Sequence, residues 1–558
     1  MEFKNHHNLF FFSMYFLCSF LKLNEANPSF FVTQISPSSN VSGGHWQLLQ
    51  SSVGVSAMHM QLLPNNKVLI FDRMDAGPSN ISLPAGTLCP KNDCTAHSVL
   101  YDIGSNAFRP LRVLTDTWCS SGSLDRNGTL IQTGGFSDGE HVIRLFEPCD
   151  VDTTACDWNE LNATRLIDRR WYATNQVLPD GRVIIVGGRR AFTYEFYPKN
   201  DFINNNKSFY LRFLVETRDP EENNLYPFLH LLPDGNLFIF ANQKSILFDY
   251  RKSIVLKQFP LIPGDDKRNY PSTGSSVMLP LRLSSAGTPV VEVLVCGGAP
   301  AGAFLKSDKM KVFVEASRTC GRLRVNDPNP QWLMESMPMP RVMSDMVLLP
   351  TGDVIIINGA ANGTAGWEDA VNPVLNPILY SVNGEPSRRF TVLSPSTIPR
   401  MYHSSAILLA DGRILVGGSN PHINYVFTGP YPTELSLETY NPYYMDSKFN
   451  SLRPSIVSVE SGNTVLYGRR FGVSFSVSLY MRGSTFVALV SPSFTTHSLG
   501  MNQRMVVLNT ASEVRLGIGN YKLMLDGPTS ANVAPPGYYM LFVVHSGIPG
   551  PAVWVKVM

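Results

Sequence analysis

Paired apolar segments recur along the first three quarters of the chain, each pair joined by a short polar turn and most pairs followed by glycines. One clear copy is LPDGRVIIVGG from Leu178, and another is LLADGRILVGG from Leu408. Asp-Gly and Asn-Gly turns between apolar runs are typical of β-hairpins, because both central residues of such a turn favour positive φ. The glycines that follow let two backbones approach closely. Each copy therefore predicts a β-hairpin.

Seven such hairpins occur, about 58 residues apart. A repeat of this length and number predicts a seven-bladed, kelch-type β-propeller in which every blade is a four-stranded sheet. An array of β-sandwiches is the alternative, and it fits the period and the number less well. The fifth copy has a longer turn than the others. The copies begin at Leu62, Leu124, Leu178, Leu231, Pro289, Leu348 and Leu408.

The pattern changes after about Pro454. Segments such as RFGVSFSVSL, RMVVLNT and GYYMLFVVHSG alternate apolar and polar residues and are separated by frequent turns. This alternation predicts a β-sandwich. We therefore predict an all-β chain, with a propeller over residues 27–451 and a C-terminal immunoglobulin-like β-sandwich over residues 452–558.

Residues 1–26 have the pattern of a signal peptide. Lys4 precedes the apolar run LFFFSMYFLCSFL, which is too short to span a bilayer comfortably, and cleavage is expected near Ala26. A signal anchor is the alternative. We find no other run of about 20 apolar residues, so the mature protein is expected to be soluble and secreted.

The bulk composition agrees with a large globular protein. The 558 residues are 44% hydrophobic and 16% charged, which is enough for a large core and more than one domain. The net charge is +2 with no basic run, so no nucleic-acid partner is predicted. Six Asn-x-Ser/Thr sequons fit a secretory route as candidate glycosylation sites: Asn40, Asn80, Asn127, Asn162, Asn206 and Asn362.

The number of cysteines is odd once the signal peptide is removed. Eight are present, and Cys18 lies in the predicted signal. In an oxidising compartment, seven cysteines leave one thiol without a partner in the chain. The spacing predicts three disulfides and leaves Cys119, in DTWCSSG, unpaired. The predicted disulfides are Cys89 with Cys94, Cys149 with Cys156, and Cys296 with Cys320.

Candidate chemistry lies at one position of the repeat. Cys119, Tyr172 and Tyr402 each lie 15 residues before the first glycine of a closing pair. Because blades are related by rotation, equal offsets predict that these side chains meet at one rim near the axis. Tyr226 and Met343 hold the equivalent positions in other blades and are expected to line the same opening.

Residues beside these positions complete the candidate site. Tyr402 and His403 could bind one ion only where the chain is not regularly extended, since neighbours on a strand point to opposite faces. Trp118 and Trp171 precede site residues and either form a pocket wall or pack in the core. Three arginines share a further offset, and structural bonds to backbone carbonyls are the favoured interpretation: Arg170, Arg341 and Arg400.

At this point the sequence resembles the glyoxal oxidase and galactose oxidase family of copper-radical oxidases, and most closely its plant and fungal glyoxal oxidase branch. The resemblance covers nearly all of the mature chain. It is carried by TWCSSGSLDRNG, RWYATNQVLPDGRVIIVGG, RMYHSSAILLADGRILVGG, SPSFTTHSLGMNQR and PPGYYMLFVVHSGIPGPA. These motifs occur in the family's order over about 400 residues.

The resemblance implies a role for each site residue and one copper ion as cofactor. Cys119 and Tyr172 would be joined by a thioether, and Tyr172 would bind copper and hold a radical. Tyr402 would be the axial ligand and proton acceptor, with His403 and His497 as the other ligands. Galactose oxidase stacks a tryptophan over the thioether, whereas the corresponding residues here are Arg189 and Arg190. We include Arg190 in the candidate substrate pocket.

The leading functional hypothesis is a secreted, extracellular oxidase of simple aldehydes. It would convert the glyoxal and methylglyoxal class with dioxygen and water into carboxylic acids and hydrogen peroxide. A primary alcohol or sugar oxidase with the same site is one alternative, and a non-catalytic propeller that binds glycans or proteins is another. Zinc is the rival metal, although tyrosines are poor ligands for a structural zinc site. The expected partners are a small aldehyde and dioxygen, and the chain is expected to be a monomer.

Overall fold

The computed structural model describes residues 43–150, 156–199, 207–284 and 288–558. All of these residues belong to one compact unit, Gln34–Met558. The predicted signal peptide and the sequons at Asn40 and Asn206 lie outside the described residues. Within the described residues, no helix combines the length and the apolar character needed to cross a lipid bilayer.

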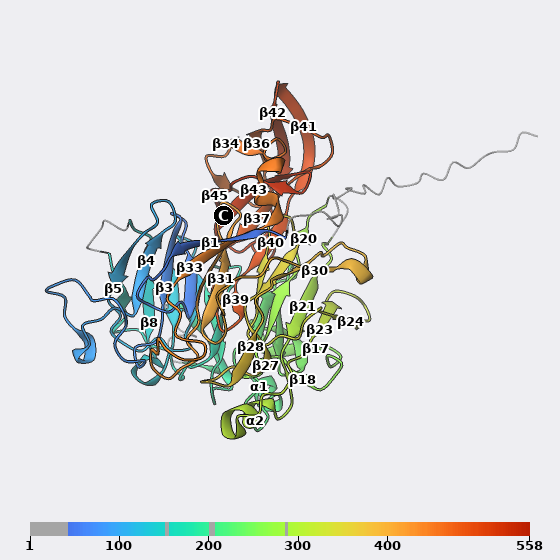
Figure 1. The fold of residues 1–558 in the computed structure, drawn as a ribbon. Helices are drawn as coiled ribbons and strands as arrows, with labels where there is room; N and C mark the ends of the chain where they lie inside the picture. The colour runs from blue at the N-terminus through green and yellow to red at the C-terminus, as the bar shows by residue number, and fades with distance from the viewer. Residues whose placement is uncertain (1–42, 151–155, 200–206, 285–287) are drawn as a thin grey trace, which may run out of the picture. The chain divides into compact units, whose positions relative to one another are not determined.

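Seven four-stranded antiparallel blades make up the first part of the described chain, as predicted (Figure 1). The hairpins found in the sequence form the first two strands of the blades. The first four blades are β2 (His59–Leu62), β3 (Lys67–Phe71), β4 (Ser98–Asp102) and β5 (Ala107–Leu111); β6 (Ser121–Leu124), β7 (Leu130–Thr133), β8 (Ile143–Phe146) and β9 (Asn159–Glu160); β10 (Ala173–Val177), β11 (Val183–Gly187), β12 (Thr193–Tyr197) and β13 (Phe209–Tyr210); and β14 (Phe228–Leu231), β15 (Leu237–Ala241), β16 (Lys244–Asp249) and β17 (Ile254–Gln258).

The last blade is completed by a strand from the beginning of the described chain, β1 (His45–Gln50), which pairs with β33 (Leu437–Asn441). This pairing joins two segments about 390 residues apart. The segment that precedes the first blade in the sequence therefore supplies the fourth strand of the last blade. The remaining blades are β19 (Gly274–Met278), β21 (Glu292–Gly297), β23 (Thr319–Arg324) and β24 (Trp332–Ser336); β25 (Asp345–Leu348), β26 (Val354–Ile357), β29 (Ile378–Tyr380) and β30 (Phe390–Val392); and β31 (Ser404–Leu408), β32 (Ile414–Gly418), β33 and β1.

The C-terminal region forms two further sheets, which confirms the predicted sandwich. One sheet also takes in β20 (Leu281–Arg282), which comes from between two strands of the fifth blade and pairs in parallel with β40 (Arg504–Val507). The sheets are β34 (Ser455–Val459), β36 (Arg470–Ser476), β42 (Asn520–Asp526) and β41 (Asn509–Gly517); and β20, β40, β37 (Thr485–Ser491), β43 (Gly537–His545), β45 (Val553–Val557) and β35 (Thr464–Val465).

A hairpin from this C-terminal region runs among the inner strands of the propeller. It consists of β38 (Phe494–Thr496) and β39 (Leu499–Met501), and β38 pairs with β2 in the first blade. The hairpin contacts the inner strands β6, β10, β19, β25 and β31. His497 lies at its turn, so this packing places a C-terminal residue on the propeller axis.

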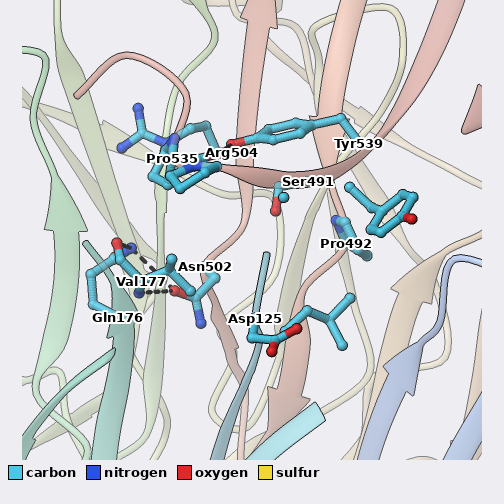
Figure 2. Close-up of a pocket in the computed structure, with 13 residues that line it drawn as sticks. Asp125, Gln176, Val177, Ser491, Pro492, Asn502, Arg504, Pro535 and Tyr539 are labelled. Atoms are coloured by element: carbon cyan, nitrogen blue, oxygen red, sulfur yellow. Dashed lines mark hydrogen bonds between the residues drawn. The ribbon is translucent and has the colours of Figure 1, made fainter. Parts of the chain in front are cut away.

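Asn502 fixes the hairpin to the third blade. Its side-chain carbonyl accepts hydrogen bonds from Val177 N at 2.7 Å and from Gln176 Nε2 at 3.1 Å (Figure 2). The neighbouring cavity, lined also by Ser491, Arg504 and other residues, has a volume of about 30 Å³. That volume is enough for roughly one water molecule, so the cavity is not a substrate site.

The three arginines with a shared offset have structural roles, as predicted. Their buried guanidinium groups donate to carbonyls at the ends of neighbouring strands: Arg170 to Gly187 and Thr193, Arg341 to Asn358 and Asn376, and Arg400 to Gly418 and Ser436. These bonds satisfy backbone acceptors at the rim, where the sheets end.

Asp345 on β25 gives the fold a pH dependence. Its side chain is 2% exposed, Oδ2 accepts from Asn358, and Oδ1 has no partner. Burial raises its pKa to about 8. The folded carboxyl therefore keeps a proton that the unfolded chain releases above about pH 4, and the free energy of unfolding falls by up to about 1.4 kcal/mol per pH unit between these values.

Asp345→Asn should remove this loss, because the amide matches the shape of the neutral acid. We expect the apparent melting temperature to fall less in the variant than in the wild type between about pH 5 and pH 7.5. Differential scanning calorimetry at both pH values measures the difference. Parallel changes in the two proteins would show that Asp345 does not hold the proton.

Candidate metal centre

The candidate residues lie in tight turns just before the inner strands. Cys119, Tyr172 and His403 have φ values of 53°, 67° and 62°, in the left-handed region that non-glycine residues rarely adopt. Backbone hydrogen bonds link these turns between blades, as from Tyr172 N to Cys119 O at 3.0 Å. The left-handed turn breaks the strand alternation, so consecutive side chains can face one site.

The register of the last blade corrects one detail of the sequence alignment. Ala173 pairs with Gly187, and Ser404 pairs with Gly418. The equivalent of Tyr172 is therefore His403, and the alignment that placed Tyr402 there was wrong by one residue. Tyr402 precedes the turn, and its ring stacks on that of His403 with centroids 3.8 Å apart. Both side chains thus reach the same site.

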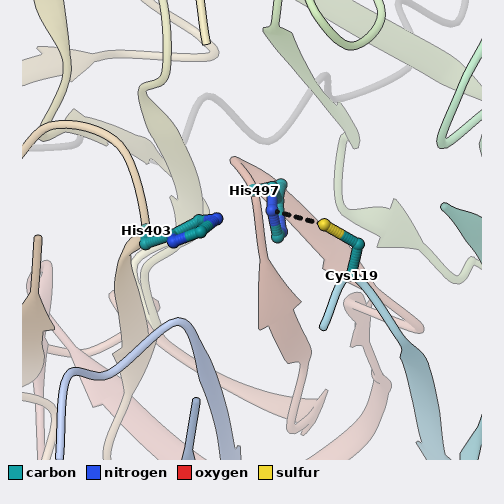
Figure 3. Close-up of side chains that lie close together, drawn as sticks. All are labelled: Cys119, His403 and His497. Atoms are coloured by element: carbon teal, nitrogen blue, oxygen red, sulfur yellow. Dashed lines mark hydrogen bonds between the residues drawn. The ribbon is translucent and has the colours of Figure 1, made fainter. Parts of the chain in front are cut away.

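The structure brings five predicted residues together. Cys119 Sγ lies 3.2 Å from His497 Nε2, and the ligand atoms of Cys119, His403 and His497 all lie within 4.8 Å of one another (Figure 3). The ring of His497 lies 6.1 Å from that of Tyr172 and 5.7 Å from that of Tyr402. None of the five side chains is more than 6% exposed.

The two histidines have the properties of metal ligands. Both ring nitrogens of His403 are buried without a hydrogen-bond partner, which is costly unless a ligand is present. His497 Nδ1 bonds Thr496 Oγ1 at 2.6 Å, which orients Nε2 toward the cluster. Burial holds the pKa of both residues well below the usual value, so both imidazoles are neutral and able to bind a cation.

The two phenols are buried beside the histidines. Burial raises the pKa of Tyr172 and of Tyr402 well above the ordinary value. Neither would ionise at neutral pH unless a cation lay beside it, since a cation favours the charged phenolate. The cluster of neutral nitrogens and phenol oxygens is therefore suited to a metal ion.

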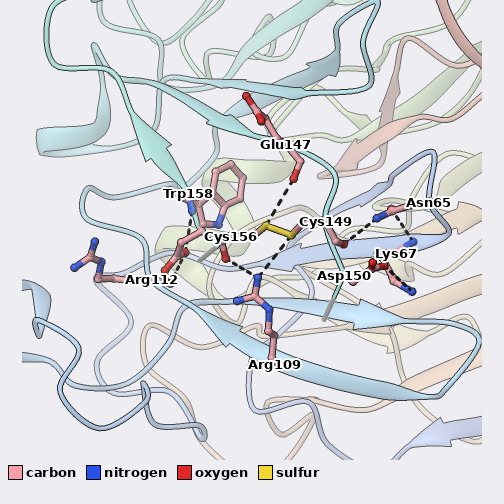
Figure 4. The surroundings of a disulfide bond; sticks show 10 residues. Asn65, Lys67, Arg109, Arg112, Glu147, Cys149, Asp150, Cys156 and Trp158 are labelled. Carbon is pink, nitrogen blue, oxygen red and sulfur yellow. Dashed lines mark hydrogen bonds and ion pairs between the residues drawn. A yellow bond between two sulfur atoms is a disulfide. The ribbon is translucent and has the colours of Figure 1, made fainter. Parts of the chain in front are cut away.

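Cys119 is the free cysteine among the described residues. The three predicted disulfides are all formed. Two hydrogen bonds hold the backbone around the Cys149–Cys156 disulfide: Arg109 donates to Cys156 O at 2.5 Å, and Asn65 donates to Cys149 O at 2.8 Å (Figure 4). Burial raises the pKa of the Cys119 thiol well above the usual value, and the Tyr172 side chain opposes that rise.

Tyr270 joins the cluster and was missed in the sequence. Its hydroxyl lies 3.0 Å from Tyr172 Oη and 2.8 Å from Tyr402 Oη, and its ring stacks on Tyr172 with centroids 4.4 Å apart. It lies three residues before Thr273, the residue of the fifth blade that is equivalent to Tyr172. The offset search could not find it for that reason.

Arg189 and Arg190 do not take the place of a stacking tryptophan. The Arg189 guanidinium lies 5.3 Å from the ring of Trp171 and pairs with Glu222 at 2.6 Å. Arg190 is 71% exposed and lines an open cavity of about 690 Å³ together with Trp171 and Arg189. The Tyr172 ring instead packs on those of Tyr270 and Trp171, with centroids 4.4 and 4.7 Å away, and meets the edge of Tyr226.

The other candidate pocket residues lie beside the cluster. Trp118 packs on Trp171 with centroids 5.0 Å apart. The Tyr226 ring lies 5.2 Å from that of His497, and its hydroxyl donates to Ser120 O at 3.0 Å. Met343 is 3% exposed and belongs to the same buried apolar cluster as Tyr402. Of the five candidate pocket residues, Arg190 is the exposed one.

Comparison with known proteins identifies the family of the chain. The family model described as glyoxal oxidase N-terminus matches residues 58–444, and the model described as galactose oxidase-like, Early set domain matches residues 453–557. The chain belongs to the glyoxal oxidase family. Within the described residues, the first match spans all seven blades apart from β1, and the second spans the sandwich.

Relatives within this family are similar over most of their length. The chain is 44% identical to aldehyde oxidase GLOX1 of Arabidopsis thaliana, covering 92% of this chain and 85% of that protein. It is 45% identical to aldehyde oxidase GLOX of Vitis pseudoreticulata, covering 92% and 97%. A solved fungal alcohol oxidase of the AA5 family, in complex with copper, has the same fold, with a TM-score of 0.70 at 20% identity, covering 93% of this chain and 100% of that one.

Proposed function

We propose that this glyoxal oxidase family member is a secreted copper-radical oxidase of simple aldehydes. It converts an aldehyde, water and dioxygen into a carboxylic acid and hydrogen peroxide. The observation that carries the proposal is the buried meeting of Cys119, Tyr172, Tyr402, His403 and His497 on the propeller axis. The high identity to aldehyde oxidases favours an aldehyde over an alcohol or a sugar as substrate.

The donor set fits one copper ion. Imidazole nitrogens and oxygen ligands suit Cu(II), and the two unpartnered nitrogens of His403 are the clearest sign of an ion. Tyr172, Tyr402, His403 and His497 would hold it. When bound, copper supplies a one-electron acceptor and a Lewis acid that acidifies a hydroxyl of the substrate hydrate.

Oxidation of an aldehyde hydrate removes two electrons, so a second one-electron store is needed beside the metal. In our proposal, Tyr172 supplies it after its ring carbon next to the hydroxyl-bearing carbon has bonded to the sulfur of Cys119. Forming that bond releases two hydrogen atoms, which dioxygen takes up as hydrogen peroxide. The turns that carry Cys119 and Tyr172 are adjacent, with Tyr172 N bonded to Cys119 O at 3.0 Å, which supports this assignment.

The protein side chains divide the proton and hydrogen transfers between them. Tyr402 accepts the hydroxyl proton of the hydrate as a general base. Tyr172 in its radical form accepts the hydrogen atom from the substrate carbon. Trp171 and Tyr270 pack against the Tyr172 ring and shield it from water.

Zinc held by Cys119, His403 and His497 is the rival arrangement, since these three alone could bind a metal. A structural zinc site is usually closed by four cysteine or histidine ligands. Within the described residues, the structure groups no fourth cysteine or histidine with these three, whereas two phenols lie beside them. Copper accounts for all five residues.

Metal removal tests the proposal. We expect the secreted protein to release peroxide with glyoxal and methylglyoxal faster than with galactose, to lose that activity in a chelator, and to regain it with Cu²⁺. A coupled peroxidase assay measures each rate. Restoration by Zn²⁺, or full activity of the metal-free protein, would refute the copper site. Absence of peroxide with every substrate would favour a non-catalytic propeller that binds glycans or proteins.

The secretory route is a further proposal. Three disulfides are typical of an oxidising compartment, which agrees with a signal peptide over residues 1–26. The sequons at Asn80, Asn127 and Asn162 are exposed, whereas Asn362 is half-buried and its amide donates to Phe313 O. We propose domain limits of 27–451 and 452–558 and a monomeric enzyme.

A further inference from the structure

Arg73 lies just after β3 and is almost completely buried, with 1% exposure. Its guanidinium carbon lies 4.8 Å from the ring centre of Trp118 and 5.0 Å from that of Trp367. The two indoles stack on each other with centroids 5.2 Å apart. An arginine packed on aromatic faces keeps the edge of its fork free to bind a ligand.

Among the described residues, no hydrogen bond satisfies this guanidinium. Nε, Nη1 and Nη2 are all buried without an acceptor, and the ion-pair partner is Asp75, whose carboxylate is 3.5 Å from Nε and 39% exposed. The indole nitrogens of Trp118 and Trp367 are also buried without acceptors. Buried donors are nearly always paired in folded proteins. A group of donors with no acceptor indicates a ligand rich in oxygen acceptors.

The donors lie beside the candidate metal centre. Trp118 is the neighbour of Cys119 in sequence. The Trp118 ring also lies 5.0 Å from that of Trp171, which packs on the Tyr172 ring with centroids 4.7 Å apart. A guanidinium this close to a metal cation would be repelled by it, unless negative charge or an oxygen dipole lay between them.

We infer that Arg73 is a substrate-binding residue that holds a second oxygen of the substrate. The inference rests on the proposed oxidase function and deepens it. The ligand class is an aldehyde whose neighbouring carbon carries a carbonyl or carboxylate oxygen, with glyoxylate as the simplest charged member. A carboxylate can accept two parallel hydrogen bonds from the arginine fork, whereas a simple alkyl aldehyde offers no such acceptor.

Trp367 positions the guanidinium from a hairpin of its own. It lies between β27 (Ala360–Gly363) and β28 (Ala370–Pro373), and Lys311 Nζ donates to its carbonyl at 3.2 Å. Lys311 also pairs with Asp369 at 2.9 Å, which fixes the end of the hairpin. The aromatic wall that carries Arg73 is therefore held from two blades.

Substrate selectivity gives the first test. The rate constant kcat/KM is measured for glyoxylate and for propanal in the wild type, Arg73→Lys and Arg73→Met. We expect the ratio of the two constants to fall by about 10- to 100-fold in Arg73→Met, mainly through KM for glyoxylate. Arg73→Lys keeps the positive charge but lacks the forked guanidinium group, so its ratio of kcat/KM for glyoxylate to that for propanal should fall less than in Arg73→Met.

Binding to the copper-free protein gives a test that does not depend on turnover. Pyruvate carries the same two oxygen functions but has no aldehyde hydrogen to lose. We expect pyruvate to change the tryptophan fluorescence of the wild type in a saturable way, and Arg73→Met to bind it at least about 10-fold more weakly. Arg251→Met is the matched control, because Arg251 packs on Tyr250 in the fourth blade and is half-exposed.

The outcomes separate this inference from the proposed function. If the wild type oxidises aldehydes but the selectivity ratio and pyruvate binding are unchanged in both Arg73 variants, Arg73 does not bind substrate and the oxidase proposal stands. A second outcome is that the wild type makes no peroxide, while the wild type and Arg251→Met bind pyruvate and Arg73→Met does not. The substrate-binding role of Arg73 is then supported, and the oxidase proposal fails. Should Arg73→Met fail to fold, judged by circular dichroism, the Arg73→Lys results decide.

Discussion

Cys119→Ser is expected to reduce peroxide production by at least about 1,000-fold, equivalent to about 4 kcal/mol in the activation barrier. Serine is similar in size but cannot form a carbon–sulfur bond, so Tyr172 would lack the sulfur that spreads the unpaired spin. The fold should persist, because the three disulfides do not involve this residue. A coupled peroxide assay with glyoxal measures the loss.

Gel mobility provides an independent readout for the same variant. A bond between residues 119 and 172 closes a loop in the denatured chain, so the wild type should migrate faster than Cys119→Ser on a denaturing gel. Wild-type protein produced without copper is the matched control and should migrate like the variant. Full oxidase activity in Cys119→Ser would be incompatible with the proposed radical site.

His497→Ala should lose the metal without unfolding the propeller. The change removes the ligand at the turn of the β38–β39 hairpin, while the pairing of β38 with β2 and the hydrogen bonds to Asn502 remain. We expect metal affinity to fall by at least about 100-fold, since a direct ligand should matter at least as much as the 10- to 100-fold typical of its supporting partners. Elemental analysis after gel filtration measures the copper per chain.

An exposed histidine serves as the control. His45→Ala, in β1, should keep the copper content of the wild type, since His45 is exposed on the outermost strand of the last blade. Circular dichroism should show the same strand content in all three proteins. If His497→Ala retained copper in full, the hairpin would have no part in the metal site.

The repeat made most of the fold predictable. Each hairpin carries its own turn signal, so the period could be measured along the sequence without knowledge of long-range pairing. Three pairings could not be predicted: β1 with β33, β20 with β40, and β38 with β2. These strands are short and join segments far apart in the chain, and a local alternation of residues does not specify the partner of a strand.

The site was predictable where the repeat is regular. The constant offset found Cys119 and Tyr172, and the family motifs supplied His497. The last blade shows the limit of counting, because His403 rather than Tyr402 occupies the equivalent position. Tyr270 and Arg73 lie outside the offset, the first three residues before the equivalent position of the fifth blade and the second just after β3. Their roles depend on side-chain packing across blades, which sequence spacing does not record.

The most direct test is mass spectrometry of the protein after exposure to copper and dioxygen. Following reduction of the disulfides and proteolysis, the peptides that contain Cys119 and Tyr172 should be found joined, with a mass lower than their sum by two hydrogen atoms. Separate peptides, with the thiol of Cys119 free to be alkylated, would contradict the radical site on which the proposed oxidase depends.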